Sequence, residues 1–132
     1  MDHAYWGPEF GSDDVSALLS QHEGEIKQAN CTVEVIREES TLCRRTASAI
    51  SEGNVVGWFQ GRMEWGPRAL GNRSILCDPR RADMKAILNA KIKRRESFRP
   101  FAPSVLQEAV SEWFEEDDAV PFMMQVFQIR SD

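Results

Sequence analysis

The sequence is short of the residues that build metal centres and disulfide frameworks. It has three cysteines, and Cys31, Cys43 and Cys77 form no CxxC pair. It has two histidines, His3 and His22, and both are distant from other candidate ligands. Zinc sites and small disulfide-linked domains need several such residues at short spacing. We therefore expect buried free thiols and no metal site.

Long apolar runs are also missing. No stretch approaches the roughly 20 apolar residues that a membrane-spanning helix needs, and the N-terminus lacks a charged segment followed by an apolar one. The sequence therefore predicts a cytoplasmic protein without a membrane segment. With 132 residues, 42% hydrophobic and 28% charged, it has the size and composition of one globular domain.

Positive charge is concentrated in the middle of an acidic chain. Between residues 62 and 99 eleven Lys and Arg face four acids, which gives +7, whereas the whole chain carries −5. The remainder therefore carries −12. Proteins with long nucleic-acid contacts are usually basic overall, so this distribution favours a local anion site over a nucleic-acid surface.

Alternating strand and helix patterns predict an α/β fold with a mostly open sheet. Strands are expected at 31–36, 54–59 and 74–77. Four helices are expected. The first begins at Asp13 with Ser12 as its cap, and the second spans 40–52. The third begins after an Asp83 cap, and the fourth follows an extended stretch at 102–106.

The end of the chain predicts a further strand at 121–130. Met124 and Val126 lie on one face of its alternating pattern, and Phe127 and Ile129 lie on the other. Because a strand needs a partner, we expect the chain to be a piece of a larger protein, with a homodimer as another way to cover this segment.

The stretch from Gly61 to Arg81 carries five arginines among glycines and a proline. It is not a P-loop, because asparagine stands at the lysine position and a strand follows where a P-loop has a helix. Gly66 and Gly71 permit unusual backbone angles, and Pro67 stiffens the chain between them. We expect this loop to aim Arg68 and Arg73 at one anion, since a guanidinium meets phosphate or carboxylate oxygens two at a time.

A second basic element runs from Lys91 to Phe101. Pro100 moves the residue before it out of helical geometry. Lys93 and Arg99 are therefore expected at a helix end and on the following loop, where their charges can converge. Arg94 and Arg95 are expected on a solvated face.

The motifs GRMEWGPRALGNRSIL, DPR and IKRRESFRPFAPSVL resemble the C-terminal domain of the nodulation and antibiotic O-carbamoyltransferases, and the similarity extends from Tyr5 to Arg130. The resemblance implies that 1–132 is a partial carbamoyltransferase C-terminal domain. It implies a YrdC-like fold, an open, twisted mixed sheet with helices packed on it, here truncated at the C-terminus.

The same resemblance implies that the domain binds carbamoyl phosphate and ATP, with Mg²⁺, and forms carbamoyl adenylate. A Kae1-like domain of the full-length chain, which carries the family's metal site, would then move the carbamoyl group to a hydroxyl. By motif, Arg68, Lys93 and Arg99 match the anion-binding and catalytic positions. Expected neighbours that bind substrate or nucleotide are Arg62, Arg73 and Ser104.

Two other classes of function use the same residues. A non-catalytic module for a phosphorylated ligand or RNA would need the arginines without the chemistry, and its affinity for RNA would fall steeply with salt. An interaction protein would explain the acidic tail and the terminal strand. The acceptor hydroxyl stays open between a nodulation oligosaccharide and an antibiotic sugar.

Overall fold

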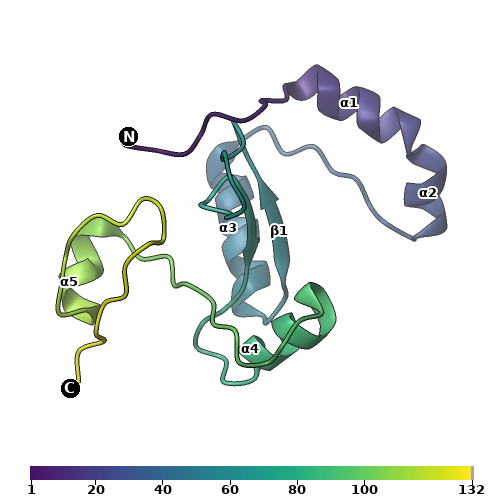
Figure 1. Ribbon diagram of the computed structural model, residues 1–132. Coiled ribbons are helices and arrows are strands. Elements are labelled where there is room, and N and C mark those ends of the chain that lie inside the picture. The colour runs from purple at the N-terminus through teal and green to yellow at the C-terminus, as the bar shows by residue number, and fades with distance from the viewer. Residues whose placement is uncertain (132) are drawn as a thin grey trace.

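The computed structural model describes residues 1–131 and shows an α/β chain built around one β-hairpin. Figure 1 shows α3 alongside the hairpin, with α1 and α2 on one side and α5 on the other. The expected α/β class is confirmed. In chain order the elements are α1 (Ser12–Gln21), α2 (Glu23–Gln28), α3 (Glu39–Ser51), β1 (Val56–Phe59), β2 (Arg73–Leu76), α4 (Met84–Ile87), the π-helix η1 (Leu88–Lys93), the 3₁₀ helix η2 (Gln107–Ala109) and α5 (Val110–Trp113).

The hairpin consists of β1 and β2, paired antiparallel with Val56 opposite Leu76 and Phe59 opposite Arg73. Its β-branched and aromatic residues suit a pleated, half-buried surface. The strands predicted at 54–59 and 74–77 are confirmed, with boundaries shifted by no more than two residues. The sheet is smaller than the mixed sheet expected, because the described residues form this antiparallel pair and no parallel one.

The strand predicted at 31–36 is wrong. The chain crosses from α2 to α3 in an extended form (Figure 1), but positions 32 to 37 make no backbone hydrogen bond with any described residue. Val33 and Val35 are 50% and 78% exposed. The alternating pattern was therefore sufficient for an extended backbone, whereas a strand also needs a neighbour with which to form a ladder.

The strand predicted at 121–130 is also wrong, because it is reduced to one isolated antiparallel bridge between Phe114 and Ile129. Phe127 packs edge-on against Phe114, with the ring centroids 6.4 Å apart. Met124 and Val126 are 72% and 93% exposed. Pairing stops at one bridge because Phe114 is the extended residue that ends α5, so it offers no strand to pair with.

Of the described helices, α3 is the one whose first turn is capped by the side chain of its N-cap residue. Gly11 rather than the predicted Ser12 caps α1, and its N–H donates to the Asp14 carboxylate at 2.8 Å. The helix predicted at 40–52 is confirmed as α3. The Glu38 carboxylate caps it and accepts from the N–H groups of residues 40 and 41 at 2.9 and 2.6 Å. Within residues 1–131 no helix combines the length and apolar character needed to cross a membrane.

The buried apolar side chains lie in two places. Ala4 lies beside the hairpin connection, where its carbonyl accepts from the N–H of Trp65 at 2.6 Å. Met84 and Leu88 are buried on α4 and η1. The helix predicted after Asp83 is confirmed, although it changes to a π-helix at Leu88. The expected Asp83 cap is wrong, because this carboxylate accepts from the guanidinium of Arg81 instead.

The expected burial of the thiols is wrong for two of the three cysteines. Cys31 and Cys43 are exposed, and Cys77 is half buried. Burial raises the pKa of the Cys77 thiol, and the neighbouring Asp78 carboxylate raises it further. A thiol in this state is a weak nucleophile at neutral pH.

Candidate functional site

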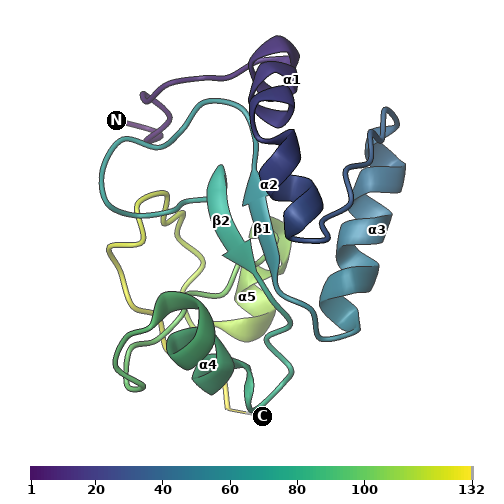
Figure 2. The ribbon, with the colours of Figure 1, turned by 90° about the vertical axis from the view of Figure 1, so that its right-hand side faces the viewer.

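The two basic segments lie at opposite ends of the hairpin. The connection from Gln60 to Asn72 joins β1 to β2 at one end, and the chain leaves β2 for α4 and η1 at the other. Figures 1 and 2 both show this separation, with α4 beneath the strands and the connection at their far end. Each segment can therefore be described as a site of its own.

Glu64 is the centre of the hairpin connection. Its side chain is fully buried, with 0% exposure. One carboxylate oxygen, Oε1, accepts from the backbone N–H groups of Leu70 at 2.6 Å, Asn72 at 2.8 Å and Arg73 at 3.3 Å. Burial raises the pKa of this carboxyl, but the hydrogen bonds, that from Leu70 foremost, outweigh burial and lower it to about 2. Glu64 is therefore an internal anion.

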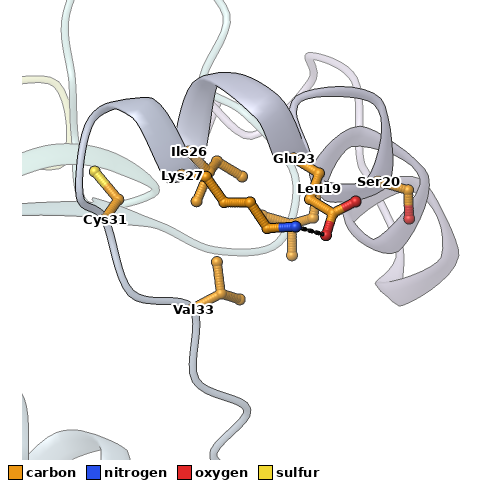
Figure 3. A pocket seen from close by; sticks show the side chains of 7 residues that line it. All are labelled: Leu19, Ser20, Glu23, Ile26, Lys27, Cys31 and Val33. Atoms are coloured by element: carbon orange, nitrogen blue, oxygen red, sulfur yellow. Dashed lines mark hydrogen bonds and ion pairs between the residues drawn. The ribbon is translucent and has the colours of Figure 1, made fainter.

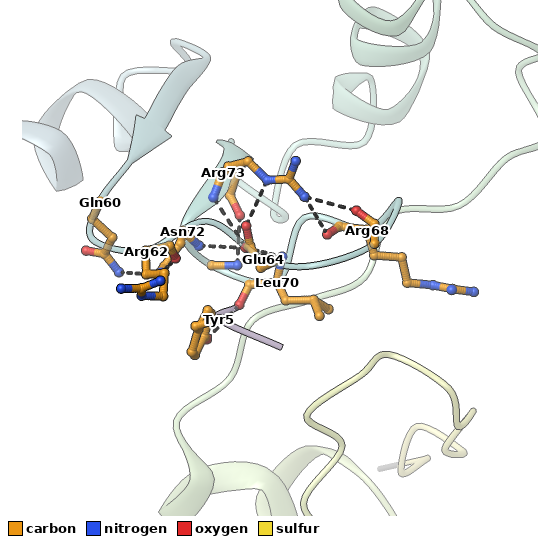
Figure 4. Close-up of polar contacts among 11 residues, drawn as sticks. Tyr5, Gln60, Arg62, Glu64, Arg68, Leu70, Asn72 and Arg73 are labelled. Carbon is orange, nitrogen blue, oxygen red and sulfur yellow. Dashed lines mark hydrogen bonds and ion pairs between the residues drawn. The ribbon is translucent and has the colours of Figure 1, made fainter. Parts of the chain in front are cut away.

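Arg73 turns into the loop. Its Nε donates to Oε2 of Glu64 at 3.0 Å, and its Nη2 donates to the carbonyl oxygens of Gly66 at 3.2 Å and Arg68 at 3.3 Å. Arg73 and Arg68 thus do not point at one common position as predicted. Figure 4 shows the Arg73 guanidinium drawn over the loop and the Arg68 side chain leading away from it.

Arg68 is the cation that the loop presents outward. It is exposed, and its guanidinium makes no hydrogen bond or ion pair within residues 1–131. Its backbone is held from two directions, because Pro67 precedes it and its carbonyl accepts from Arg73. A guanidinium on such a loop can bind an external anion without first breaking an internal contact.

Arg62 lies on the other side of the loop from Arg68 (Figure 4). Its Nη1 donates to the carbonyl of Gly7 at 3.1 Å, and its Nη2 lies 3.6 Å from Glu9. Arg62 therefore fastens the N-terminal segment to the loop. The structure does not bring it together with Arg68, and its predicted role in binding stays a prediction.

The second basic segment is organised by Asn89, which is 1% exposed. Its Nδ2 donates to the carbonyls of Ser97 at 3.2 Å and Arg99 at 3.0 Å, and its Oδ1 accepts from Nε of Arg95 at 2.8 Å. Arg95 also donates to the carbonyl of Pro100 at 3.2 Å, and its guanidinium lies 4.7 Å from the centre of the Phe101 ring. The prediction that Arg95 is solvated is wrong, because it closes this loop.

The remaining predicted residues of this segment face solvent. Lys93 ends η1, is exposed, and has no ion pair or hydrogen bond from its amine within the described chain. Arg99 pairs with Glu96 at 2.9 Å, and both side chains are about half exposed. Ser104 is exposed in the stretch 102–106, which belongs to no helix or strand and in which Leu106 has extended backbone angles. The roles assigned to these three residues stay predictions.

The arginines of the DPR motif are held locally. The buried Asp78 carboxylate accepts from the N–H, Nε and Nη2 of Arg80 at 2.9, 2.9 and 2.7 Å, which lowers the pKa of Asp78 to about 2. Arg81 makes its pair with Asp83 at 2.8 Å. These two arginines therefore shape the turn between β2 and α4.

Glu64 and Asn89 were not predicted from the sequence. For Glu64 a signal exists, since it is the one carboxylate between Gly61 and Cys77, a stretch with three arginines. Such a residue is a candidate to pair internally with one of them. For Asn89 the sequence offers no such signal, because it directly follows Leu88 and so points about 100° away from it around an α-helix.

Two hollows of the surface lie away from these arginines. One of about 490 Å³ lies between α1, α2 and the start of the extended segment (Figure 3), and its one cation, Lys27, pairs with Glu23 at 2.6 Å. None of its lining residues belongs to either basic segment. Within residues 1–131 no three His, Cys, Asp or Glu side chains come together as metal ligands would. Arg68 and Lys93 are thus presented on open surfaces.

The family of this chain follows from its sequence relatives. The family model described as carbamoyltransferase C-terminus matches residues 47–132. The nodulation protein NolO of Bradyrhizobium diazoefficiens is 45% identical over 134 residues, which cover 98% of this chain and 23% of that protein. An uncharacterized protein of Synechocystis is 47% identical over 132 residues, which cover all of this chain and 20% of that protein.

A relative with a named activity is the 3'-hydroxymethylcephem-O-carbamoyltransferase of Amycolatopsis lactamdurans. It is 44% identical over 84 residues, 64% of this chain and 16% of that enzyme. The chain spans about a fifth of the length of the curated relatives that it matches in full. It is homologous to the C-terminal part of O-carbamoyltransferases and belongs to the carbamoyltransferase C-terminus family.

Proposed function

We propose that the chain is part of an O-carbamoyltransferase and binds carbamoyl phosphate and ATP, with Mg²⁺, for the formation of carbamoyl adenylate. The observation that carries the proposal is the outward guanidinium of Arg68, held on a tightly bonded loop in a chain of this family. Lys93 and Arg99 are the second group of cations in the proposal, with Ser104 beside them in the chain.

The chemistry requires positive charge more than it requires a nucleophile. Water first cleaves carbamoyl phosphate to carbamate and inorganic phosphate. A carbamate oxygen then attacks the α-phosphorus of ATP, and the bond from that phosphorus to pyrophosphate breaks. Negative charge then develops on the leaving pyrophosphate, where a fixed guanidinium or ammonium stabilises it. The raised pKa of Cys77 disfavours its thiolate, which agrees with a mechanism without a protein nucleophile.

The acceptor step belongs to a second part of the protein in this proposal. A Kae1-like domain of the same full-length chain would transfer the carbamoyl group to a hydroxyl. The relatives are about five times as long as this chain, which leaves room for such a domain. We therefore expect the 132-residue chain to bind carbamoyl phosphate or ATP and not to carbamoylate an alcohol by itself.

The test is a calorimetric titration of the 132-residue chain with carbamoyl phosphate, and separately with ATP and Mg²⁺. Arg68→Ala should weaken binding by about 1.5–3 kcal/mol, the usual value of a lost charge-assisted hydrogen bond. Arg37→Ala is the matched control. Arg37 is exposed on the segment between α2 and α3, so its substitution removes the same charge at a different place. Equal losses of affinity in the two variants would mean that the ligand is attracted by the overall charge and not by a site. Carbamoylation of an alcohol by this chain alone would contradict the proposal that a second domain performs the transfer.

A further inference from the structure

In the loop between β1 and β2, three backbone N–H groups donate to one anion. That anion is the carboxylate of Glu64, a residue of the same loop. The N–H groups of Leu70, Asn72 and Arg73 all point at Oε1 of Glu64, at 2.6, 2.8 and 3.3 Å. Successive N–H groups that converge in this way form a concave anion site in many proteins. Here the carboxylate fills that site, so these N–H groups are not available to a phosphate.

Arg73, the partner of Glu64, fixes two carbonyl groups of the loop. Arg73 donates from Nε to Oε2 of Glu64, and from Nη2 to the carbonyls of Gly66 and Arg68, within 3.3 Å in each case. One carboxylate and one guanidinium thus hold three donors and two acceptors of the backbone between Gly66 and Arg73. Gly66 and Gly71 have φ values of 105° and 118°, which let the chain turn around the pair.

The position of Arg68 follows from this arrangement. Its own carbonyl is one of the two that Arg73 holds. Leu70 is held as well, since its N–H binds Glu64 and its carbonyl accepts from the hydroxyl of Tyr5 at 3.1 Å. The backbone on the C-terminal side of Arg68 is therefore fixed, while its side chain extends outward (Figure 4).

We propose that Glu64 and Arg73 are positioning residues, which hold the loop from Gly66 to Asn72 in one shape so that Arg68 meets an external anion. The inference rests on the proposed function, because it takes Arg68 as the anion-binding residue. It assigns Arg73 to the interior of the loop, although its residue type and its place in the motif predict contact with substrate. At this loop the external anion is then bound by the guanidinium of Arg68 and not by that of Arg73.

The closing experiment is a double-mutant cycle with inorganic pyrophosphate as the probe. Arg68→Ala, Arg73→Lys and the double variant are titrated in calorimetry at one ionic strength, with Arg37→Ala as the charge control. Arg68→Ala should weaken pyrophosphate binding about tenfold or more. Arg73→Lys, which keeps the charge and loses the planar fork, should weaken it about fivefold alone and not at all in the Arg68→Ala background.

The second measurement is amide hydrogen exchange of Glu64→Gln. The N–H groups of Leu70 and Asn72 should exchange about tenfold faster or more, because their acceptor has lost its charge. The N–H of Glu52, which bonds the Ser48 carbonyl at the C-terminal end of α3, should exchange as in the parent. Pyrophosphate binding should weaken together with this local loss of protection. If Glu64→Gln loses protection in α3 as well, the substitution has destabilised the whole fold. The positioning role is then decided by the Arg73→Lys cycle, because Arg73→Lys leaves the three N–H bonds to Glu64 in place.

The outcomes separate the two proposals. Additive losses for Arg68→Ala and Arg73→Lys would place Arg73 directly on the anion and overturn the positioning role. Unchanged binding and exchange in Glu64→Gln would overturn it too, and the proposed function would stand as long as Arg68→Ala weakens binding. If Arg68→Ala binds pyrophosphate as the parent does, the proposed site fails and the positioning proposal, which rests on it, fails for that reason.

Discussion

The two basic segments of this chain share one arrangement: a buried polar side chain binds the backbone of a loop, and an arginine closes that loop. They differ in the residue that is buried. In the hairpin connection a buried Glu64 gathers the backbone and Arg73 closes the loop over it. After η1 a buried Asn89 gathers the backbone and Arg95 closes that loop. In each segment one arginine is used internally and another cation faces solvent, which is Arg68 in the first and Lys93 in the second.

The difference lies in the charge of the buried residue. Glu64 accepts only, and its contacts need it to be ionised. Asn89 donates to two carbonyls and accepts from Arg95 without any charge of its own. A loop organised by a carboxylate can therefore be loosened by acid, whereas a loop organised by an amide cannot.

The largest expected effect is that of Glu64→Ala. The substitution leaves the partly buried Arg73 guanidinium and three N–H groups without their acceptor, so the free energy of unfolding should fall by about 3 kcal/mol. Glu9→Ala removes the half-exposed partner of Arg62 and should cost about 0.5 kcal/mol or less. Urea unfolding of both variants measures the difference, and similar costs would mean that Glu64 is an ordinary surface acid.

The pH dependence of stability should distinguish the two loops. The folded pKa of Glu64 is about 2 and its ordinary value is 4.5, so its contribution is complete above pH 4.5 and is lost as the pH falls through about 2. The parent should therefore lose about 3 kcal/mol more than Glu64→Gln between those pH values. An Asn89→Ala variant, although less stable, should keep the slope of the parent. Acid unfolding followed by circular dichroism tests this, and parallel curves for the parent and Glu64→Gln would contradict it.

Arg95→Ala should have an intermediate effect. It removes the bond to the buried Asn89 and the contact with the Phe101 ring, so the expected cost is about 2 kcal/mol in the free energy of unfolding. Lys91→Ala removes an exposed cation of the same segment and should change stability by about 0.5 kcal/mol at most. Thermal unfolding compares the two, and a neutral Arg95→Ala would restore the solvated position that the sequence predicts.

The smallest expected effect concerns backbone strain. The first loop has glycine at its positive φ angles, whereas the second has Arg94 at φ 48° after η1. Arg94→Gly should stabilise the fold by about 0.5 kcal/mol, because glycine takes this conformation without a side-chain clash. Arg94→Ala removes the same charge and keeps the β-carbon, so it should bring no gain. A gain in both variants would trace the effect to charge.

The sequence predicts those parts of the fold whose partners are near in the chain. The two hairpin strands and α3 follow from local alternation, periodicity and glycine at the helix end. The segment 31–36 has an equally good alternating pattern and fails as a strand, because pairing depends on a neighbour that local sequence does not specify.

The site shows the same limit at the scale of side chains. The motif predicts which positions carry guanidinium groups, but it does not predict which of them turn inward. Arg73 and Arg68 are of one residue type, five positions apart, and only the contact with Glu64, nine positions before Arg73, separates their roles. That contact depends on the three-dimensional course of the loop, so it became visible only in the structure.

Internal pairing also bears on how an anionic ligand arrives. Of the eleven cations between residues 62 and 99, five have a carboxylate within 4 Å in the described chain. Viewed from more than about a Debye length, roughly 10 Å at 0.1 M salt, each such pair is close to neutral. Six of the eleven are left without such a partner within residues 1–131, so the long-range field of the segment corresponds to about half of its count of cations. We expect the association rate constant of an anionic ligand to fall with ionic strength less steeply than eleven unpaired cations would require.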